Sequence, residues 1–257
     1  DKGVNFFDTA GVYGLGLSEE RLSRILGNRR NDVIIATKGG LSWKESKFKR
    51  STVVKDSSPS AIRKDVENSL RRLRLQSLPI FFIHWPDHNI PLEDTFDELS
   101  KLKNAGKINS IGCSNFSEQQ LFKACEVTKI DYVQIPINIL NKPLDKSISD
   151  ICTKNKIKVI AYNVLSNGLL TGKFNINTKF QENDRRYRLQ QFKGTHYINN
   201  LEKVENLKLK AAKMNISLLN YVVNYVLMQK NVHSAVIGIK NSKQLLENYS
   251  IIFKQTL

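Results

Sequence analysis

The stretch GVNFFDTAGVY, from Gly3 to Tyr13, decides how the rest of the chain is interpreted. Residues 4–7, VNFF, predict a buried strand, and Asp8 stands where that strand ends. Tyr13 follows in the next loop. A carboxylate at a strand end, followed closely by a phenol, is an unusual pair to leave at the solvent-facing end of an apolar strand. The pair therefore marks this strand end as a candidate site.

Two later strands end in the same way. The run VIIATK ends on Lys38, and the run IFFIHW carries His84. Because the carboxyl ends of parallel strands meet at one edge of a sheet, these residues are expected to converge with Asp8 and Tyr13. Four such groups at one edge indicate an enzyme.

Strand and helix signals alternate almost to the end of the chain, which indicates a parallel α/β fold. Seven strand signals occur, each followed by a helix, whereas a closed barrel needs eight. The opening DKG is typical of the end of a helix that leads into a strand. The prediction is therefore a (β/α)8 TIM barrel of parallel strands lacking its first strand-helix unit, as a single domain over residues 1–257. A seven-stranded or open doubly wound sheet is the alternative.

Local signals place several helix ends and loops. Ser18 is predicted to cap a helix over SEERLSRIL, with Glu19 favourably placed in its first turn. Ser58 and Pro59 are predicted to open a helix that runs to about Arg74. The polar stretches 41–58 and 166–200 are predicted to be long loops, and these would set substrate specificity.

The composition bounds the class of protein. The 257 residues are 40% hydrophobic, which allows a sizeable core. No run of eighteen apolar residues occurs and no signal peptide is visible, so neither a membrane span nor secretion is expected. Three cysteines without a Cys-x-x-Cys motif suggest neither a disulfide framework nor a zinc site. A cytoplasmic location is therefore expected.

The formal charge of +16, from 40 basic and 24 acidic residues, raises the question of a nucleic-acid partner. The lysines are dispersed, however, and no basic block is interleaved with aromatic residues, so no nucleic-acid partner is predicted. Part of the charge could serve an anionic cofactor. No metal site is predicted either, because Pro86 separates His84 from His88 and keeps them off a common helix face.

Polar residues or glycine recur at or near the predicted strand ends. One such residue would be ordinary, whereas eight from seven strands predict a site at this face. They are Asp8, Lys38, His84, Ser114, Asn115, Gln134, Tyr162 and Gly238.

With these residues in place, the sequence resembles the aldo-keto reductase superfamily, and in particular its larger bacterial members. The resemblance covers nearly the whole chain. It is carried, in this order, by FFDTAGVYG, SEERL, ATKGG, IHWPD, IGCSNF, VQIPIN, AYNVLSNGLLTGKF and GIKNSKQLLEN.

The resemblance implies hydride transfer from NADPH to the carbonyl of a small aldehyde or ketone. Tyr13 would donate the proton, and because a free phenol has a pKa of ~10, the Lys38 ammonium would have to lower it. Asp8 would pair with Lys38 and hold it charged. His84 would hydrogen-bond the carbonyl oxygen. Asp8, Tyr13, Lys38 and His84 thus match the family's catalytic tetrad, and Trp85 would wall the substrate pocket.

The same resemblance implies the cofactor-binding residues. Ser114, Asn115 and Gln134 would hydrogen-bond the nicotinamide amide, and Tyr162 would stack on its ring. The loop along the pyrophosphate would include Asn163, Leu165 and Lys173. The adenosine end would be bound by Gly238, Lys240, Gln244, Glu247 and Asn248, where Lys240 would meet the 2′-phosphate and favour NADPH over NADH.

One departure from the family lies in this loop. Asn163 and Val164 stand where the family usually has Ser-Pro, which changes a hydrogen bond and frees a backbone angle.

Three other functions stay open at this point. The chain could be a non-catalytic, cofactor-sensing subunit on the same scaffold, an inactive fragment, or, more remotely, a nucleic-acid-binding protein. The sequence does not encode the oligomeric state or the physiological substrate.

Overall fold

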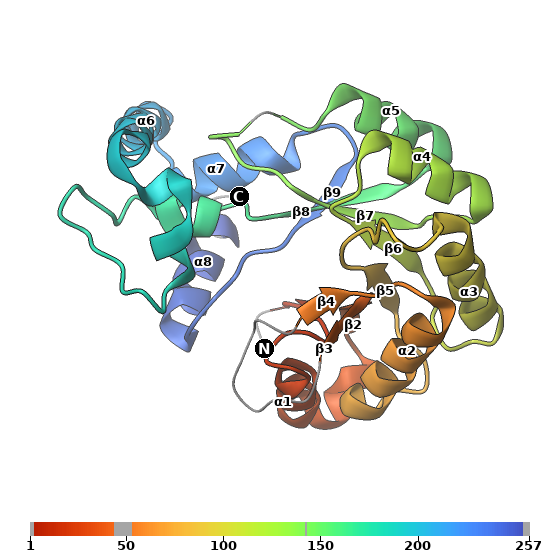
Figure 1. Ribbon diagram of the computed structural model, residues 1–257. Coiled ribbons are helices and arrows are strands. Elements are labelled where there is room, and N and C mark those ends of the chain that lie inside the picture. The colour runs from red at the N-terminus through yellow and green to blue at the C-terminus, as the bar shows by residue number, and fades with distance from the viewer. Residues whose placement is uncertain (1–2, 44–52, 142, 254–257) are drawn as a thin grey trace. The chain divides into compact units, whose positions relative to one another are not determined.

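The computed structural model describes residues 3–43, 53–141 and 143–253 (Figure 1). The chain forms two compact units, which are described separately. Unit 1 comprises Asp1–Ile135 and Lys146–Val159, and unit 2 comprises Pro136–Asp145 and Ile160–Leu257. The expectation of a single domain over residues 1–257 stays a prediction.

Unit 1 is built on a parallel sheet whose strands are neighbours in chain order. They are β1 (Phe6–Asp8), β2 (Ile34–Gly39), β5 (Ile80–Ile83), β6 (Ile111–Ser114) and β7 (Tyr132–Pro136). The next strand, β8 (Lys158–Tyr162), begins beside β7, where the Lys158 N–H donates to the Asp131 carbonyl at 3.1 Å.

The helices of unit 1 follow the strands one by one, and neighbouring helices pack side by side (Figure 1). This alternation confirms the predicted parallel β/α class of fold. The helices are α1 (Leu17–Leu26), α2 (Pro59–Leu73), α3 (Leu92–Asn104), α4 (Glu118–Val127) and α5 (Lys146–Asn155), with a 3-10 turn η1 (Gly27–Asn31) after α1.

The core of unit 1 is organised around β5, whose residues are all buried. Phe81 and Phe82 are fully buried and, as successive strand residues, point to opposite faces of the sheet. Both neighbouring strands carry a glycine at the point of contact. A Cβ on Gly39 would lie 2.5 Å from the Phe81 ring, and one on Gly112 would overlap the Phe82 ring. The two glycines therefore make room for the two rings.

Two local predictions for the helix starts have different outcomes. Ser58 caps α2, accepting the Ala61 N–H at 3.4 Å, and Pro59 is the first residue of that helix, as expected. The prediction that Ser18 caps α1 is wrong, because α1 begins one residue earlier, after Gly16 in a left-handed conformation. The Ser18 hydroxyl instead pairs with the Thr9 hydroxyl at 2.8 Å, at the end of β1.

The predicted loop 41–58 is partly regular structure. Strands β3 (Leu41–Trp43) and β4 (Val53–Lys55) form an antiparallel pair, and residues 44–52 lie outside the described part of the chain. This corrects the prediction, which the polar composition of the stretch had suggested.

Unit 2 includes the end of β8, and β9 (Val232–Ala235) lies beside it, since the Val236 N–H donates to the Ala161 carbonyl at 2.8 Å. Its other elements are the 3-10 turns η3 (Ser166–Thr171), η4 (Arg185–Arg188) and η5 (Gln190–Phe192), and the helices α6 (Gly194–Lys213), α7 (Leu218–Leu227) and α8 (Ser242–Phe253). No helix within the described ranges has the length and apolarity needed to cross a membrane.

The predicted loop 166–200 has a small core of its own. The rings of Phe174, Phe180 and Phe192 pack edge to face, with centroids 5.0–6.0 Å apart, and Tyr197 joins them. The Arg186 guanidinium lies 4.5 Å from the Phe180 ring centroid. Aromatic packing therefore helps to order this segment. The prediction of a long loop over 166–200 is partly wrong, because the segment contains η3, η4, η5 and the start of α6.

The fit between β5 and its neighbours makes Gly112 a sensitive position. We expect Gly112→Ala to lower the free energy of unfolding by about 1–3 kcal/mol, because the added methyl group has to displace the buried Phe82 ring. Urea denaturation measures this change. Gly238→Ala is the control, since its added carbon meets nothing within 4 Å. Equal stability of the two variants would contradict the proposed packing.

Candidate active site

The structure brings Asp8, Lys38, Tyr13 and His84 together in unit 1. Asp8 is the last residue of β1, Lys38 lies near the end of β2, and His84 follows β5. The Lys38 ammonium donates to Asp8 Oδ2 at 2.6 Å and to the Thr9 carbonyl at 2.8 Å. The Lys38 side chain is only 1% exposed and that of Asp8 10%. A buried ion pair thus joins two neighbouring strand ends.

Tyr13 and His84 lie against this ion pair. Lys38 Nζ is 5.2 Å from the centroid of the Tyr13 ring. The His84 ring meets the Tyr13 ring edge-on, with centroids 5.6 Å apart. Tyr13 is 42% exposed as a residue, whereas the Lys38 ammonium beside it is buried. The tyrosine therefore borders solvent on one side and the ion pair on the other.

Burial sets the protonation of the two basic groups. It lowers the pKa of His84 to about 3, with a smaller contribution from the positive charge of Lys38. His84 is therefore neutral at pH 7 and can donate one hydrogen bond. Its Nδ1 is buried and has no hydrogen-bond partner among the described residues. Burial also lowers the pKa of Lys38, while Asp8 acts in the opposite direction and favours the ammonium form.

Three polar residues from β6 and β7 adjoin this cluster. Ser114 and Gln134 are paired in register at the carboxyl ends of their strands and are 1% and 2% exposed. Gln134 Nε2 donates to Asp8 Oδ1 at 2.8 Å. Asn115 Nδ2 donates to the His84 carbonyl at 2.9 Å and to Ser114 Oγ at 3.0 Å. The sequence predicted these residues at the site, but the bond from Gln134 to Asp8 could not be foreseen.

These side chains also suit a carboxamide ligand. A hydroxyl and two amides offer both donors and acceptors, which is what the amide of a nicotinamide requires. Asn115 has a left-handed backbone, with φ of 63°, a conformation that asparagine tolerates better than most residues. The residues present therefore fit the nicotinamide end of the expected cofactor.

A second buried carboxylate supports the loop that carries Tyr13. Glu19 is fully buried in α1, where its Oε1 accepts from the Thr37 hydroxyl at 2.6 Å and its Oε2 from Arg72 Nη1 at 3.0 Å. The Arg72 guanidinium also lies over the Trp43 ring, 5.8 Å from its centroid. Thr37 directly precedes Lys38, so this network anchors the strand end that carries the ammonium.

Sequence reasoning missed this role of Glu19. The pattern SEERL indicated only a favourable charge near a helix N-terminus. Its partners stand 18 and 53 residues further along the chain, and nothing in the local pattern distinguishes Glu19 from the exposed Glu20.

Trp85, the residue predicted to wall the substrate pocket, follows His84 and is 42% exposed. The Lys55 ammonium of β4 lies 5.7 Å from the centroid of its ring. The pair β3–β4 therefore reaches the side of the site where a substrate wall is expected.

In unit 2 the loop after β8 is held by asparagine side chains. Asn163 adopts a left-handed backbone, with φ of 53°, and its Oδ1 accepts the Asn167 N–H at 2.9 Å. Asn138 Nδ2 donates to the Asn163 carbonyl at 3.3 Å. These bonds constrain the loop at the point where the family usually has Ser-Pro. Tyr162, which precedes it, is half-buried, and burial raises its pKa.

The remaining predicted cofactor residues also lie in unit 2. Lys173 is exposed, with its ammonium 5.3 Å from the Phe174 ring centroid, and Leu165 precedes η3. Around the start of α8, Gln244 Oε1 accepts the Lys240 N–H at 2.9 Å, so Gln244 shapes the turn that carries Lys240. The others in this segment are Gly238, Glu247 and Asn248, of which Gly238 and Glu247 are exposed.

A parallel β/α sheet with an acid, a base and a phenol gathered at its carboxyl edge is the arrangement of a barrel-type enzyme. The sequence profile described as the aldo/keto reductase family matches residues 1–256. The chain therefore belongs to the aldo/keto reductase family.

Individual relatives agree with this assignment. The chain is 33% identical over 248 residues to the aldo-keto reductase YhdN of Bacillus subtilis (strain 168), covering 95% of this chain and 73% of that protein. It is 27% identical over 259 residues to the NADH-specific methylglyoxal reductase of Escherichia coli (strain K12), covering 97% and 79%.

The structural comparison gives the same result. The glycerol dehydrogenase AKR11B4 from Gluconobacter oxydans is similar with a TM-score of 0.86 and 34% identity, over 100% of this chain and 83% of that chain. The match confirms the (β/α)8 barrel as the class of fold, and the chain is an enzyme of an oxidoreductase family that uses nicotinamide cofactors.

One half-buried carboxyl group near the site has a strongly shifted pKa. Asp65 of α2 accepts the Gly40 N–H on Oδ2 at 2.8 Å, just after the strand end that carries Lys38. Burial raises the pKa of Asp65 from 3.8 to about 6, and the Gly40 hydrogen bond and Arg72 offset only part of this effect. The folded protein therefore holds this proton more tightly than the unfolded chain.

The free energy of unfolding should consequently fall as the pH rises from 3.8 towards 6, because in this range the unfolded chain has released a proton that the folded state still holds. Above pH 6 the free energy of unfolding is lowered by the full amount, on the order of 3 kcal/mol. Asp65→Asn should abolish this part of the pH dependence while keeping an acceptor for Gly40. Urea denaturation from about pH 3.5 to about pH 7.5, a range that spans this window, measures it. The exposed control Asp32→Asn should follow the wild type, and an Asp65→Asn curve parallel to the wild type would refute the assignment.

Proposed function

We propose that the chain is an NADPH-dependent reductase of small aldehydes or ketones, with Tyr13 as the general acid. The observation that carries the proposal is the buried Lys38 ammonium, which lies between Asp8 and the Tyr13 ring beside a neutral His84. Each group has the surroundings that its role in carbonyl reduction requires.

When bound, the cofactor would supply a hydride to the carbonyl carbon, and the protein would have to stabilise the charge that grows on the oxygen. Tyr13 provides the proton for that oxygen. Lys38 favours the phenolate left behind, because a positive charge beside a phenol stabilises its ionised form. Asp8 and the Thr9 carbonyl hold the ammonium charged and aimed, despite the burial that disfavours its charge.

His84 orients the carbonyl. Because its imidazole is neutral, it carries one N–H and can donate this to the oxygen without competing with Tyr13 for the proton transfer. Its ring meets the Tyr13 ring edge-on, with centroids 5.6 Å apart, and this proximity supports assigning both side chains to the same carbonyl oxygen.

The cofactor is proposed to bind through two sets of residues. Ser114, Asn115 and Gln134 would hold the nicotinamide amide, and Gln134 would do so while it also braces Asp8. The second set comprises Tyr162 for the ring, Asn163, Leu165 and Lys173 for the pyrophosphate, and Gly238, Lys240, Gln244, Glu247 and Asn248 for the adenosine end. Trp85 would contact the substrate.

The role of Tyr13 has a direct kinetic test. Tyr13→Phe should lower kcat for a small aldehyde by about 10²–10⁴, since it removes the general acid. The affinity for NADPH, measured by cofactor fluorescence, should change by less than about threefold. The matched control Tyr132→Phe should keep full activity, because Tyr132 is the first residue of β7 and the site lies at the carboxyl ends of the strands. An active Tyr13→Phe enzyme would refute the proposed acid.

Cofactor choice depends on Lys240 in this proposal. Lys240→Ala should weaken NADPH binding by about tenfold, because it removes an ammonium from a phosphate dianion, and should leave NADH binding unchanged. Fluorescence titration with both cofactors measures this. Lys230→Ala removes the same charge from another exposed position and serves as the control. A wild type that prefers NADH, as the E. coli relative does by its name, would overturn the NADPH assignment.

A further inference from the structure

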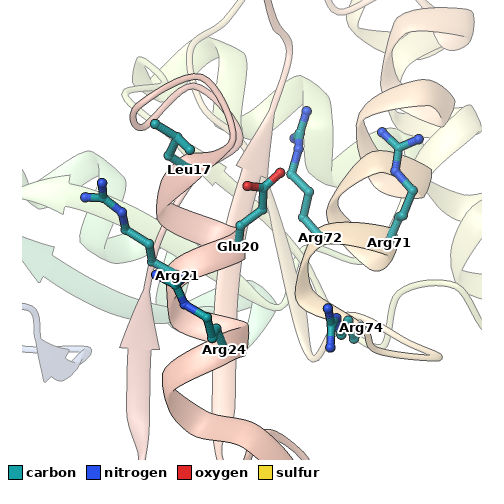
Figure 2. A pocket seen from close by; sticks show the side chains of 7 residues that line it. All are labelled: Leu17, Glu20, Arg21, Arg24, Arg71, Arg72 and Arg74. Atoms are coloured by element: carbon teal, nitrogen blue, oxygen red, sulfur yellow. The ribbon is translucent and has the colours of Figure 1, made fainter.

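A pocket lined by arginines lies in unit 1, away from the proposed catalytic cluster. It has a volume of about 520 Å³ and lies between α1 and the end of α2 (Figure 2). We call it the arginine pocket, and its lining residues are Leu17, Glu20, Arg21, Arg24, Arg71, Arg72 and Arg74. None of them belongs to the proposed catalytic or cofactor-binding residues.

The choice of arginine is not explained by the composition of the chain. Arginine provides 12 of the 40 basic residues and lysine the other 28. All five cations of the pocket are nevertheless arginine. Dispersed lysines on solvated helix faces account for most of the positive charge of the chain, but they do not account for this concentration of guanidinium groups.

Helix electrostatics explains part of the cluster. Arg24 stands in the last turn of α1, and Arg71 and Arg72 stand in the last turn of α2, where positive charge is favourable. Arg21 lies one turn earlier in α1, and Arg74 follows the end of α2. The helix ends therefore do not require all five arginines, nor that they line one pocket.

Most of these charges lack a carboxylate partner in the described part of the chain. Arg72 is paired with the buried Glu19 at 3.0 Å. Arg71 Nη2 donates to a neutral amide oxygen, Asn68 Oδ1, at 3.0 Å. Among the described residues, no ion pair within 4.0 Å joins Arg21, Arg24, Arg71 or Arg74 to an acid.

Glu20 is the acidic residue of the pocket lining, and its carboxylate is directed towards Arg72 in Figure 2. The lining therefore carries five positive charges and one negative charge around a shared hollow. Like charges repel in such an arrangement, and an anion bound among them would relieve the repulsion.

We propose that the arginine pocket binds a small anion that carries two or more adjacent phosphate groups. Guanidinium groups match phosphate oxygens with two parallel hydrogen bonds, and their weak hydration makes them better suited to this than lysine. The volume falls within the range of small-molecule sites, roughly 300–1,000 Å³. The arginines come from both helices, and a chain of phosphates offers more oxygens to engage them at once than a single phosphate does.

Calorimetric titration of the 257-residue protein with inorganic tripolyphosphate tests the proposal, with orthophosphate and ATP run at equal ionic strength. Tripolyphosphate should bind at least about tenfold more tightly than orthophosphate. ATP binding as tightly or more tightly would identify a nucleotide as the ligand, whereas much weaker ATP binding would identify inorganic polyphosphate. Absence of saturable tripolyphosphate binding would overturn the proposal.

Variants locate the binding. Arg24→Gln combined with Arg71→Gln should weaken tripolyphosphate binding by at least about tenfold. The control pair Lys64→Gln and Lys123→Gln removes the same charge from exposed positions of α2 and α4 outside the pocket, and should stay within about twofold of the wild type.

Equal losses in the two pairs would show a diffuse effect of net charge and would refute the site. Thermal melting without ligand checks that each variant is folded. If the first pair is unfolded, Arg21→Gln combined with Arg74→Gln applies the same test from the other arginines of the pocket. Tripolyphosphate binding does not require the proposed reductase activity, so the two proposals can fail independently.

Discussion

The buried ion pair between Lys38 and Asp8 is the interaction on which the rest of the site depends. Withdrawing two charges from water costs several kcal/mol per ion, so such a pair is tolerated only where every charged atom has a partner. Lys38 satisfies this with Asp8 and the Thr9 carbonyl, and Asp8 satisfies it with Lys38 and Gln134. The pair is weak evidence for stability, because an apolar pair of the same volume would do as well. It is better explained by its position, which places a positive charge beside the ring of the exposed Tyr13.

The segment between β1 and α1 carries that phenol, and polar contacts fix it at both ends. The hydroxyl groups of Thr9 and Ser18 pair across its base, and Glu19 ties its far end to Thr37 on β2. Glu19 is held in turn by Arg72, so α2 takes part in positioning the segment. These contacts explain how a loop residue can be 42% exposed and still be held against the ring of His84.

Much of this arrangement follows from the sequence, and the limit lies where partners are distant in the chain. The apolar runs ending in Asp8, Lys38 and His84 predicted both the parallel strands and the edge at which the polar groups meet, because strand direction fixes that edge. The helix start at Ser58 was also predictable, because its signal lies in the adjacent residues Ser58 and Pro59. The capping role expected of Ser18 was wrong because Thr9, at the strand end, competes for its hydroxyl. Likewise, the polar stretch 41–58 gave no sign that its flanks pair as strands β3 and β4.

The hydrogen bond from Gln134 to Asp8 has a consequence for the shape of unit 1. In the order of the sheet, β1 and β7 are separated by four inter-strand steps. On a flat sheet these steps would place the two strands about 19 Å apart, beyond the combined reach of the two side chains. A separation of 2.8 Å between Nε2 and Oδ1 therefore requires the sheet to curve, and the bond links two strands across the concave side of the curve. Any motion that flattened the sheet would have to break this hydrogen bond, and Asp8 would then keep Lys38 but lose Gln134 as a partner.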